Sequence, residues 1–470
     1  MNELPPSIAT AGEWLRSKRV SSLELTQEML ARARATQETL AAFFTLTEGP
    51  AIEAARRADD ELARGIDRGP LHGIPLAIKD ILATVDAPTT ANSRVLDPAW
   101  GAREDATVVR KLREAGAVIT GKLVLHEFAI GWPDPSTGLP YAKNPWDVAR
   151  SPGGSSSGTG AAVAASLVLG GLGTDTGGSI RGPAAYCGIS GLKPTFGRVS
   201  KEGCVPLGFS LDHIGPMART MRDCAAMLQV MAGFDPLDRS SARVPVPDML
   251  SGLNGSFDGV RIGVPREYFF DVPELNAEVR RSVLAAIDEI RKAGASVQDV
   301  AIPHAAIARN AQRAIMFSEA YAYHESDLRT RPELYGKYTR QQIQQGALYS
   351  AADFVQAERV RSLITDEALS ALNGVDVLVT PTMLNVAPRF DEYDQDSMRR
   401  LPTFTAIWNL TGLPAASVCC GFSEAGLPIG MQIIARPFDE PTLLRVGDAY
   451  QRITDWHIRT PATVREVQPA

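Results

Sequence analysis

The sequence has little of what several common classes of protein require. Its 470 residues include five cysteines, an odd number with no CxxC pair, so neither a disulfide framework nor a thiol redox motif is indicated. The six histidines are scattered and form no zinc-binding pattern. A formal net charge of −6 offers no basic surface for nucleic acid. These absences favour a reduced intracellular chain without a dedicated metal site.

Long hydrophobic runs are also missing. The longest nearly apolar stretch, residues 161–173, is too short to cross a bilayer. The first ten residues contain an acidic residue and two prolines, and they lack the apolar centre of a signal peptide. We therefore expect a cytoplasmic protein.

Helical and strand-like segments alternate along most of the chain. Ser21 and Glu24 have the spacing of a capping box at the start of a helix, and residues 51–63 predict a second helix. From residue 73 onward, short apolar runs broken by Gly and Pro alternate with helical stretches. Further elements are expected at residues 276–293, 376–382, 415–422, 428–435 and 442–453. This alternation predicts one large α/β layer structure.

The most informative region is 151–195, where two loops rich in Ser and Gly, GGSSSG and DTGGS, flank an Ala/Val/Leu segment. A helix over 157–169 would rise about 20 Å. An extended run over 172–177 would return about the same distance. Ser155 and Ser179 would then lie close together, although they are 24 positions apart. Amide N–H groups of such turns can point at one bound atom, as an oxyanion hole requires.

Simpler interpretations of this block must be weighed against catalysis. A cluster of Ser and Gly is most often a loop or a linker. The stretch 154–158 also fits the G-x-S-x-G nucleophile elbow with Ser156 at its centre, but that motif follows a strand, and residues 148–152 do not predict one. A phosphate-binding loop is disfavoured because Thr159 stands where the lysine of that motif must be.

Lys79 closes the apolar run GIPLAIKD. A lysine in this position commonly extends its ammonium group to water at the end of a strand. If Lys79 is buried instead, its charged form is disfavoured, and it can act as a general base near neutral pH. A serine nucleophile needs such a base. No histidine of the chain lies in a recognisable nucleophile context, so Lys79 is the candidate.

The Ser/Gly block reads GGSSSGTGAAVAA and then GLGTDTGGSIRGPAAYCGISGLKPTFGRVS. Together with GIPLAIKD, SLDHIGPMART and NLTGLPAASV, it resembles the amidase signature family over nearly the whole chain. The resemblance implies a single α/β/α domain over 1–470, with a large mixed sheet covered by helices on both faces. Its parts would be an N-terminal helical segment over 1–65, a core with the catalytic residues over 66–235, and the rest of the sheet with the substrate-pocket segments over 236–470.

The resemblance also implies a Ser-cisSer-Lys triad that hydrolyses an amide through an acyl-enzyme. Ser179 of DTGGS would be the nucleophile, Ser155 of GGSSSG would relay protons, and Lys79 would be the base. The peptide bond between Gly154 and Ser155 would be cis. No metal and no organic cofactor would take part.

The loop that carries the nucleophile would also stabilise the oxyanion. By resemblance, the amides of Thr176, Gly177, Gly178 and the nucleophile itself would form the oxyanion hole. Asp175 and Arg181 are interpreted as charges that fix this loop.

Two members of the family compete, a stand-alone amidase and the glutamine-hydrolysing subunit of a tRNA-dependent amidotransferase. That subunit looks to bind the charged ends of glutamine through an Arg in a basic pair before a Gly and through an Asp upstream of an NLAGLP-like stretch. Gln341 and Gln342 stand at the first place and Pro402 at the second, so both charges are missing. This difference favours the stand-alone amidase. A third interpretation, a catalytically inactive scaffold or binding protein, is disfavoured by the intact triad.

Four aromatic residues lie in segments that, by resemblance, flank the site: Trp132, Tyr141, Phe404 and Trp408. The alternative interpretation of each is an ordinary aromatic residue of the core. If two or more line the channel, an unpaired charge buried there would cost several kcal/mol, whereas an aromatic ring would gain from burial. We therefore expect a small, neutral, hydrophobic amide, anilide or carbamate as the substrate. We expect no nucleic-acid or membrane partner, and a homodimer is compatible with the sequence.

Overall fold

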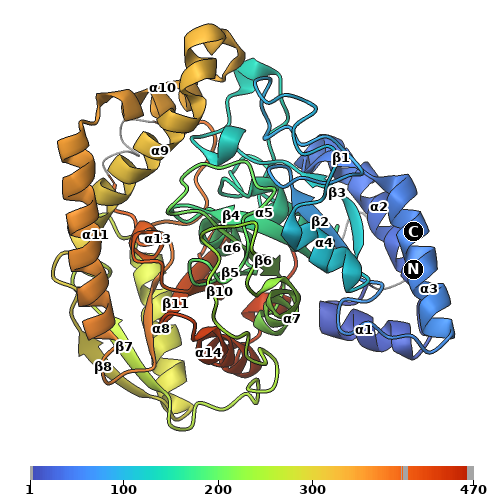
Figure 1. Cartoon of the computed structure of the whole chain (residues 1–470). Helices are drawn as coiled ribbons and strands as arrows, with labels where there is room; N and C mark the ends of the chain where they lie inside the picture. The colour runs from blue at the N-terminus through green and yellow to red at the C-terminus, as the bar shows by residue number, and fades with distance from the viewer. Residues whose placement is uncertain (1–3, 393, 395–400, 463–470) are drawn as a thin grey trace.

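The structure is a computed structural model that describes residues 4–392, 394 and 401–462. Its strands are β1 (Phe43–Leu46), β2 (Pro75–Lys79), β3 (Val118–Leu123), β4 (Gly170–Asp175), β5 (Ser190–Lys193), β6 (His213–Ala218), β7 (Arg261–Pro265), β8 (Ser296–Val300), β9 (Val377–Pro381), β10 (Ala415–Phe422) and β11 (Pro428–Ala435). In the described part of the chain, these strands form one 11-stranded sheet in the order β1-β3-β2-β4-β6-β5-β10-β11-β9-β7-β8 (Figure 1).

The sheet is mixed. The strand β2 pairs in parallel with β3 and β4, and β7 pairs in parallel with β8 and β9. Between these two groups, β6, β5, β10 and β11 pair antiparallel with their neighbours. The predicted α/β fold with a large mixed sheet is confirmed.

Helices cover both faces of the sheet. The α-helices are α1 (Ile8–Arg16), α2 (Ser22–Leu40), α3 (Glu48–Ala63), α4 (Thr107–Glu114), α5 (Ser157–Ala164), α6 (Arg181–Cys187), α7 (Met221–Met231), α8 (Ala277–Lys292), α9 (Ala308–Thr330), α10 (Lys337–Gln344), α11 (Ala351–Ala371), α13 (Ala406–Leu410) and α14 (Glu440–Ile453). Successive residues of a strand face opposite sides of its sheet. In β4, Gly170 faces Met227 of α7, whereas Gly171 faces Thr159 of α5. The two helices therefore pack on opposite faces of one central strand.

Local sequence signals account for the position of most elements. The capping box of Ser21 and Glu24 begins α2, and the side chain of Asn276 caps α8. The strands expected at 415–422 and 428–435 are β10 and β11 with the same bounds. The helix expected over 157–169 was predicted too long, because α5 ends at Ala164 and the chain turns at Ser166, whose φ is 54°. The division into 1–65, 66–235 and 236–470 stays a prediction.

The elements that carry the candidate site converge at the centre of the sheet. The strand β2 ends at Lys79, β4 leads into the loop before α6, and α5 begins directly after the GGSSS loop. The helices α9, α10 and α11 form a flank beside the central strands, and α9 contacts both α10 and α11 (Figure 1). None of the helices in the described ranges has the length and apolar character needed to span a bilayer.

Candidate active site

Lys79 is fully buried at the end of β2. Its Nζ atom lies 2.8 Å from Ser155 Oγ, 2.9 Å from Ser156 Oγ and 2.8 Å from Thr174 Oγ1. All three neighbours are hydroxyl groups, and in the described part of the chain no carboxylate forms an ion pair with this amine at contact distance. The interpretation of Lys79 as a strand-end residue that extends to water is therefore excluded.

Burial lowers the pKa of Lys79 to about 7, against weaker opposing effects of Cys204, Asp175 and Asp212. Near neutral pH, Lys79 is then the neutral amine in a large fraction of the molecules. The neutral amine has a lone pair and can accept a proton. The expected condition for a lysine general base is met in the structure.

The backbone of β4 orients the hydroxyl group of Ser156 beside Lys79. Ser156 Oγ donates to the carbonyl oxygen of Thr174 at 3.2 Å, so its single hydrogen is already used. Ser156 must therefore accept a hydrogen bond from Lys79. A neutral lysine has two N–H donors, which Ser156 and Thr174 can accept, and its lone pair is then directed at Ser155. This arrangement makes Ser155 the hydroxyl that can lose a proton to Lys79.

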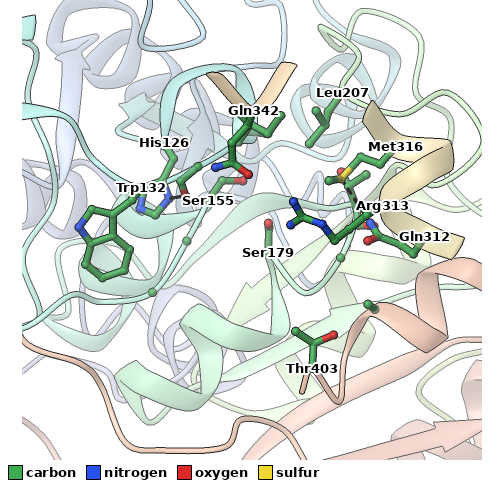
Figure 2. A pocket seen from close by; sticks show the side chains of 18 of the residues that line it. His126, Trp132, Ser155, Ser179, Leu207, Gln312, Arg313, Met316, Gln342 and Thr403 are labelled. Atoms are coloured by element: carbon green, nitrogen blue, oxygen red, sulfur yellow. Dashed lines mark hydrogen bonds between the residues drawn. The ribbon is translucent and has the colours of Figure 1, made fainter. Parts of the chain in front are cut away.

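Ser155 and Ser179 are brought together, as the spacing of the two loops predicts. The backbone N–H of Ser156 donates to the carbonyl oxygen of Ser179 at 3.3 Å, which joins the two loops. Both serines line one pocket with a volume of about 280 Å³, where Figure 2 shows their side chains. The peptide bond between Gly154 and Ser155 is cis, as expected.

Asp175 and Arg181 hold the loop that carries Ser179. Arg181 donates to the two carboxylate oxygens of Asp175 through Nε at 3.0 Å and Nη2 at 2.9 Å, and both side chains are fully buried. Burial alone would raise the pKa of Asp175, but the Arg181 guanidinium outweighs it and holds this pKa well below its usual range. The position of both charges agrees with a loop-fixing role.

One residue of the expected oxyanion hole needs a correction. The N–H of Gly178 donates to Asp175 Oδ1 at 2.7 Å, because the loop folds back over that carboxylate. This amide therefore fixes the loop rather than facing the pocket. Thr176, Gly177 and Ser179 do line the pocket. The oxyanion role of their amides stays a prediction.

Two side chains from distant segments support this loop and were not found from the sequence. Gln312 of α9 donates from Nε2 to the carbonyl oxygen of Thr176 at 3.0 Å. Thr405 donates from Oγ1 to the carbonyl oxygen of Gly177 at 2.6 Å. Neither belongs to a recognisable motif, and the first contact depends on how α9 packs. A third partner, Asn409, binds Asp175 and does lie in the quoted stretch NLTGLPAASV.

His126 is a further buried residue of the pocket wall. Its ring lies against Gly154, where an added Cβ would meet it at 2.0 Å. Burial lowers the pKa of His126 to about 4, so the ring is neutral at physiological pH. Because Nδ1 lies 3.0 Å from the carbonyl oxygen of Gly131, it carries the hydrogen and leaves Nε2 as an acceptor. No motif around His126 indicated this placement.

The expectation of a pocket without charged side chains is wrong. Of the four expected aromatic residues, Trp132 lines the pocket, Tyr141 packs against Phe390, and Phe404 and Trp408 are buried in the core. The pocket instead contains two cationic side chains, Arg309 and Arg313 of α9. The prediction failed because α9, a helix without a motif, forms one wall.

The sequence matches the model of the family described as Amidase over residues 24–444. The chain belongs to the amidase family. This amidase is therefore a hydrolase that acts on amide C–N bonds. A relative from Chloroflexus aggregans, 44% identical over 98% of each chain, is named as one of the subunits of glutamyl-tRNA(Gln) amidotransferase.

Two solved structures of amidase relatives resemble this fold over most of their length. One is described as a vestigial protein complex that reveals the evolutionary origins of an s-triazine catabolic enzyme. It is 34% identical, with a TM-score of 0.88 over 95% of this chain and 98% of the other. The second is the corresponding glutamyl-tRNA(Gln) amidotransferase subunit of Thermotoga maritima, 34% identical, with a TM-score of 0.77 over 90% of each chain.

These relatives correct two predictions. The preference for a stand-alone amidase of neutral hydrophobic amides, anilides or carbamates is wrong, because full-length relatives at 44% identity are named amidotransferase subunits. The expectation of no nucleic-acid partner and a small-molecule substrate alone is overturned by the same names, which contain both a tRNA and the word subunit. The prediction rested on the two charges missing at Gln342 and Pro402, and it did not include the arginines that α9 places in the pocket wall.

Proposed function

We propose that this amidase is the glutamine-hydrolysing subunit of a tRNA-dependent amidotransferase. It would release ammonia from the side-chain amide of glutamine, and partner subunits would use that ammonia to amidate glutamate carried by tRNA. The named relatives support the assembly. The observation that carries the chemistry is the 2.8 Å contact between Lys79 Nζ and Ser155 Oγ beside a pocket that Ser179 shares.

The first half of the reaction would form an acyl-enzyme. Ser179 Oγ attacks the amide carbonyl carbon while its proton passes to Ser155, and the proton of Ser155 passes to the lone pair of Lys79. The C–N bond then breaks as the nitrogen takes a proton from Ser155, which regains one from Lys79. Ammonia leaves, and the acyl group remains on Ser179 as an ester.

The second half would use the same relay on water. A water molecule attacks the ester carbon as its proton passes through Ser155 to Lys79, and Ser179 recovers a proton when the ester bond breaks. In both halves the negative oxygen would be stabilised by the amides of the loop that Asp175 and Gln312 hold in place. Loss of one oxyanion donor costs about 3–4 kcal/mol in comparable sites.

Burial favours the neutral form of the base before substrate arrives. Protonating Lys79 puts a charge in a buried environment whose nearest groups are hydroxyls. The surroundings therefore favour proton transfer from Lys79 to the leaving group when the C–N bond breaks.

We also propose a cytoplasmic location, and the five free cysteines agree with it.

Ammonia release from glutamine tests the chemistry. Ser179→Ala and Ser155→Ala should each lose activity by several orders of magnitude. Ser157→Ala is the matched control, because Ser157 is a buried serine that follows the same loop and whose Oγ lies 3.5 Å from the carbonyl oxygen of Val124. Equal losses in all three variants would argue for a structural role of the loop.

Replacement of a known subunit tests the assembly. The chain would take the place of its 44% identical relative among the other subunits of the Chloroflexus aggregans amidotransferase, and amidation of glutamyl-tRNA(Gln) would be measured. Glutamine hydrolysis without binding or amidation would contradict the amidotransferase assignment.

A further inference from the structure

Two arginines of one helix face the candidate active site. Arg309 and Arg313 lie four positions apart on α9, so they share one face of the helix, and both line the pocket that holds Ser179. In Figure 2 the guanidinium group of Arg313 extends from α9 toward Ser179, and Gln342 lies across the pocket from it. Cationic nitrogens thus reach the space beside the nucleophile.

The pocket wall has positive charges and no described acid. Within the described ranges, none of the residues that line this pocket is Asp or Glu. Burial, and to a lesser extent the charge of Arg313, lower the pKa of Arg309 to about 10, so Arg309 remains cationic at neutral pH. Both guanidinium groups carry positive charge at the pocket wall, where the carboxylate of a ligand can accept their hydrogen bonds.

The helix α9 supplies positive charge that α10 lacks. By resemblance to the amidotransferase subunit, an arginine that binds the carboxylate of glutamine is expected near Gln341 and Gln342. The structure places Gln342 in the pocket wall, so that position does face the site, but without a charge. The helix α9 packs against α10 and supplies Arg313 instead. Pro402 occupies the position expected for the acid that would bind the ammonium group, and no acid lines the part of the pocket wall that the structure describes.

We propose that Arg313 and Arg309 form a carboxylate-binding subsite, so that this amidase recognises the carboxylate of its amide substrate and does not recognise the ammonium group. The inference rests on the proposed hydrolysis at Ser179. Its substrate class is the primary amide with a carboxylate at its far end. Glutamine belongs to this class, and so does glutaramate, which is glutamine without the ammonium group.

The size of the pocket agrees with such a substrate. Its volume of about 280 Å³ is slightly below the range of drug-sized ligand sites, which occupy roughly 300–1,000 Å³, and so suits a small substrate. Guanidinium groups bind carboxylates with paired, charge-assisted hydrogen bonds, which are stronger than bonds between neutral groups. A neutral amide of the same length would leave both arginines without that interaction.

Binding to the Ser179→Ala chain tests the inference without catalysis. Calorimetry would measure the Kd of four amides of matched length: glutaramate, glutamine, pentanamide and 5-aminopentanamide. Glutaramate and glutamine should bind within about threefold of each other, and the two amides without a carboxylate at least about tenfold more weakly. Adding Arg313→Gln should raise the Kd of both carboxylates by about 10- to 100-fold. Adding Arg340→Gln should change no Kd by more than about twofold, because Arg340 lies on α10 outside the pocket and bonds to Pro332.

Three results would overturn the inference. They are equal binding of pentanamide and glutaramate, an unchanged Kd for carboxylates after Arg313→Gln, and binding of glutamine more than about tenfold tighter than glutaramate. A thermal melt of each variant separates loss of binding from loss of folding. If binding follows the expected order but the wild-type chain releases ammonia from none of the four amides, the proposed hydrolysis fails and the carboxylate subsite stands.

Discussion

Lys79 Nζ lies 2.8 Å from Ser155 Oγ although 76 positions separate the two residues in the sequence. The contact depends on β2 ending beside the loop that precedes α5, and both residues are buried there. A lysine in this environment is a base because it is desolvated, and a serine beside it can transfer protons in both directions. The expected behaviour of the enzyme follows from this pair.

The rate of amide hydrolysis should rise with pH through the pKa of Lys79. Because burial lowers this pKa to about 7, Lys79 is protonated and inactive as a base below that value and neutral above it. We expect kcat/KM for glutaramate to increase about tenfold per pH unit below about pH 6.5 and to level off above about pH 8. Steady-state ammonia release from about pH 5.5 to about pH 9 measures this profile. A flat profile over that range would rule out Lys79 as the titrating base.

The hydroxyl groups around Lys79 should tune this profile. Thr174 Oγ1 lies 2.8 Å from Lys79 Nζ and stabilises the ammonium form more than the neutral amine. Thr174→Val removes this acceptor at nearly constant shape, so the pKa of Lys79 should fall further and the acid limb should move to lower pH. Ser157→Ala should leave the limb in place. A shift toward higher pH in Thr174→Val would contradict this account of the pair.

The fold could be predicted to the level of elements and layers because its signals are local. The capping box of Ser21 and the apolar runs of β10 and β11 each determine an element within a few residues. The end of α5 was missed because its Ala/Val/Leu continuation is equally compatible with helix. In the structure α5 ends at Ala164, and Ser166 adopts a left-handed conformation that no residue type in this stretch indicates.

The position of the proposed catalytic residues was predictable from two loops and one strand end, whereas the pocket was not. Ser155, Ser179 and Lys79 lie in motifs whose spacing limits where they can go. Arg313 and Gln312 lie on α9, which has no motif, and they reach the site through the packing of a helix that is distant from Ser179 in the sequence. The charge of the pocket wall therefore depends on tertiary packing, and the uncharged residue at Gln342 could not reveal it.

A fluorophosphonate probe should label Ser179. This serine lines the pocket, whereas Ser156 is fully buried and its Oγ donates to the carbonyl oxygen of Thr174. Peptide mass spectrometry should find the adduct on the peptide that contains Ser179, and Ser179→Ala should abolish it. Labelling should weaken in Lys79→Ala, because the hydroxyl then has no base. An adduct on Ser156 would support the nucleophile-elbow interpretation instead.

Breaking the pair between Arg181 and Asp175 should destabilise the protein far more than breaking a surface pair. Arg181→Met leaves a carboxylate in a fully buried site without its cation, which costs about 3–5 kcal/mol. Arg261→Met is the matched control: Arg261 lies 2.7 Å from Asp376, but its side chain is 51% exposed, and such pairs contribute less than about 1 kcal/mol.

The loss of stability in Arg181→Met should also depend on pH. In the wild type, Arg181 holds the pKa of Asp175 below its usual range, so the stability from this pair is present at neutral pH and is lost as pH falls through the folded-state pKa. In Arg181→Met, burial raises that pKa instead, so the carboxyl group takes up a proton more readily in the folded than in the unfolded chain. The difference in unfolding free energy between wild type and variant should therefore be largest near neutral pH and shrink toward about pH 5. Urea unfolding at both pH values measures it, and a loss at neutral pH no larger than that of Arg261→Met would show that the buried pair does not hold the loop.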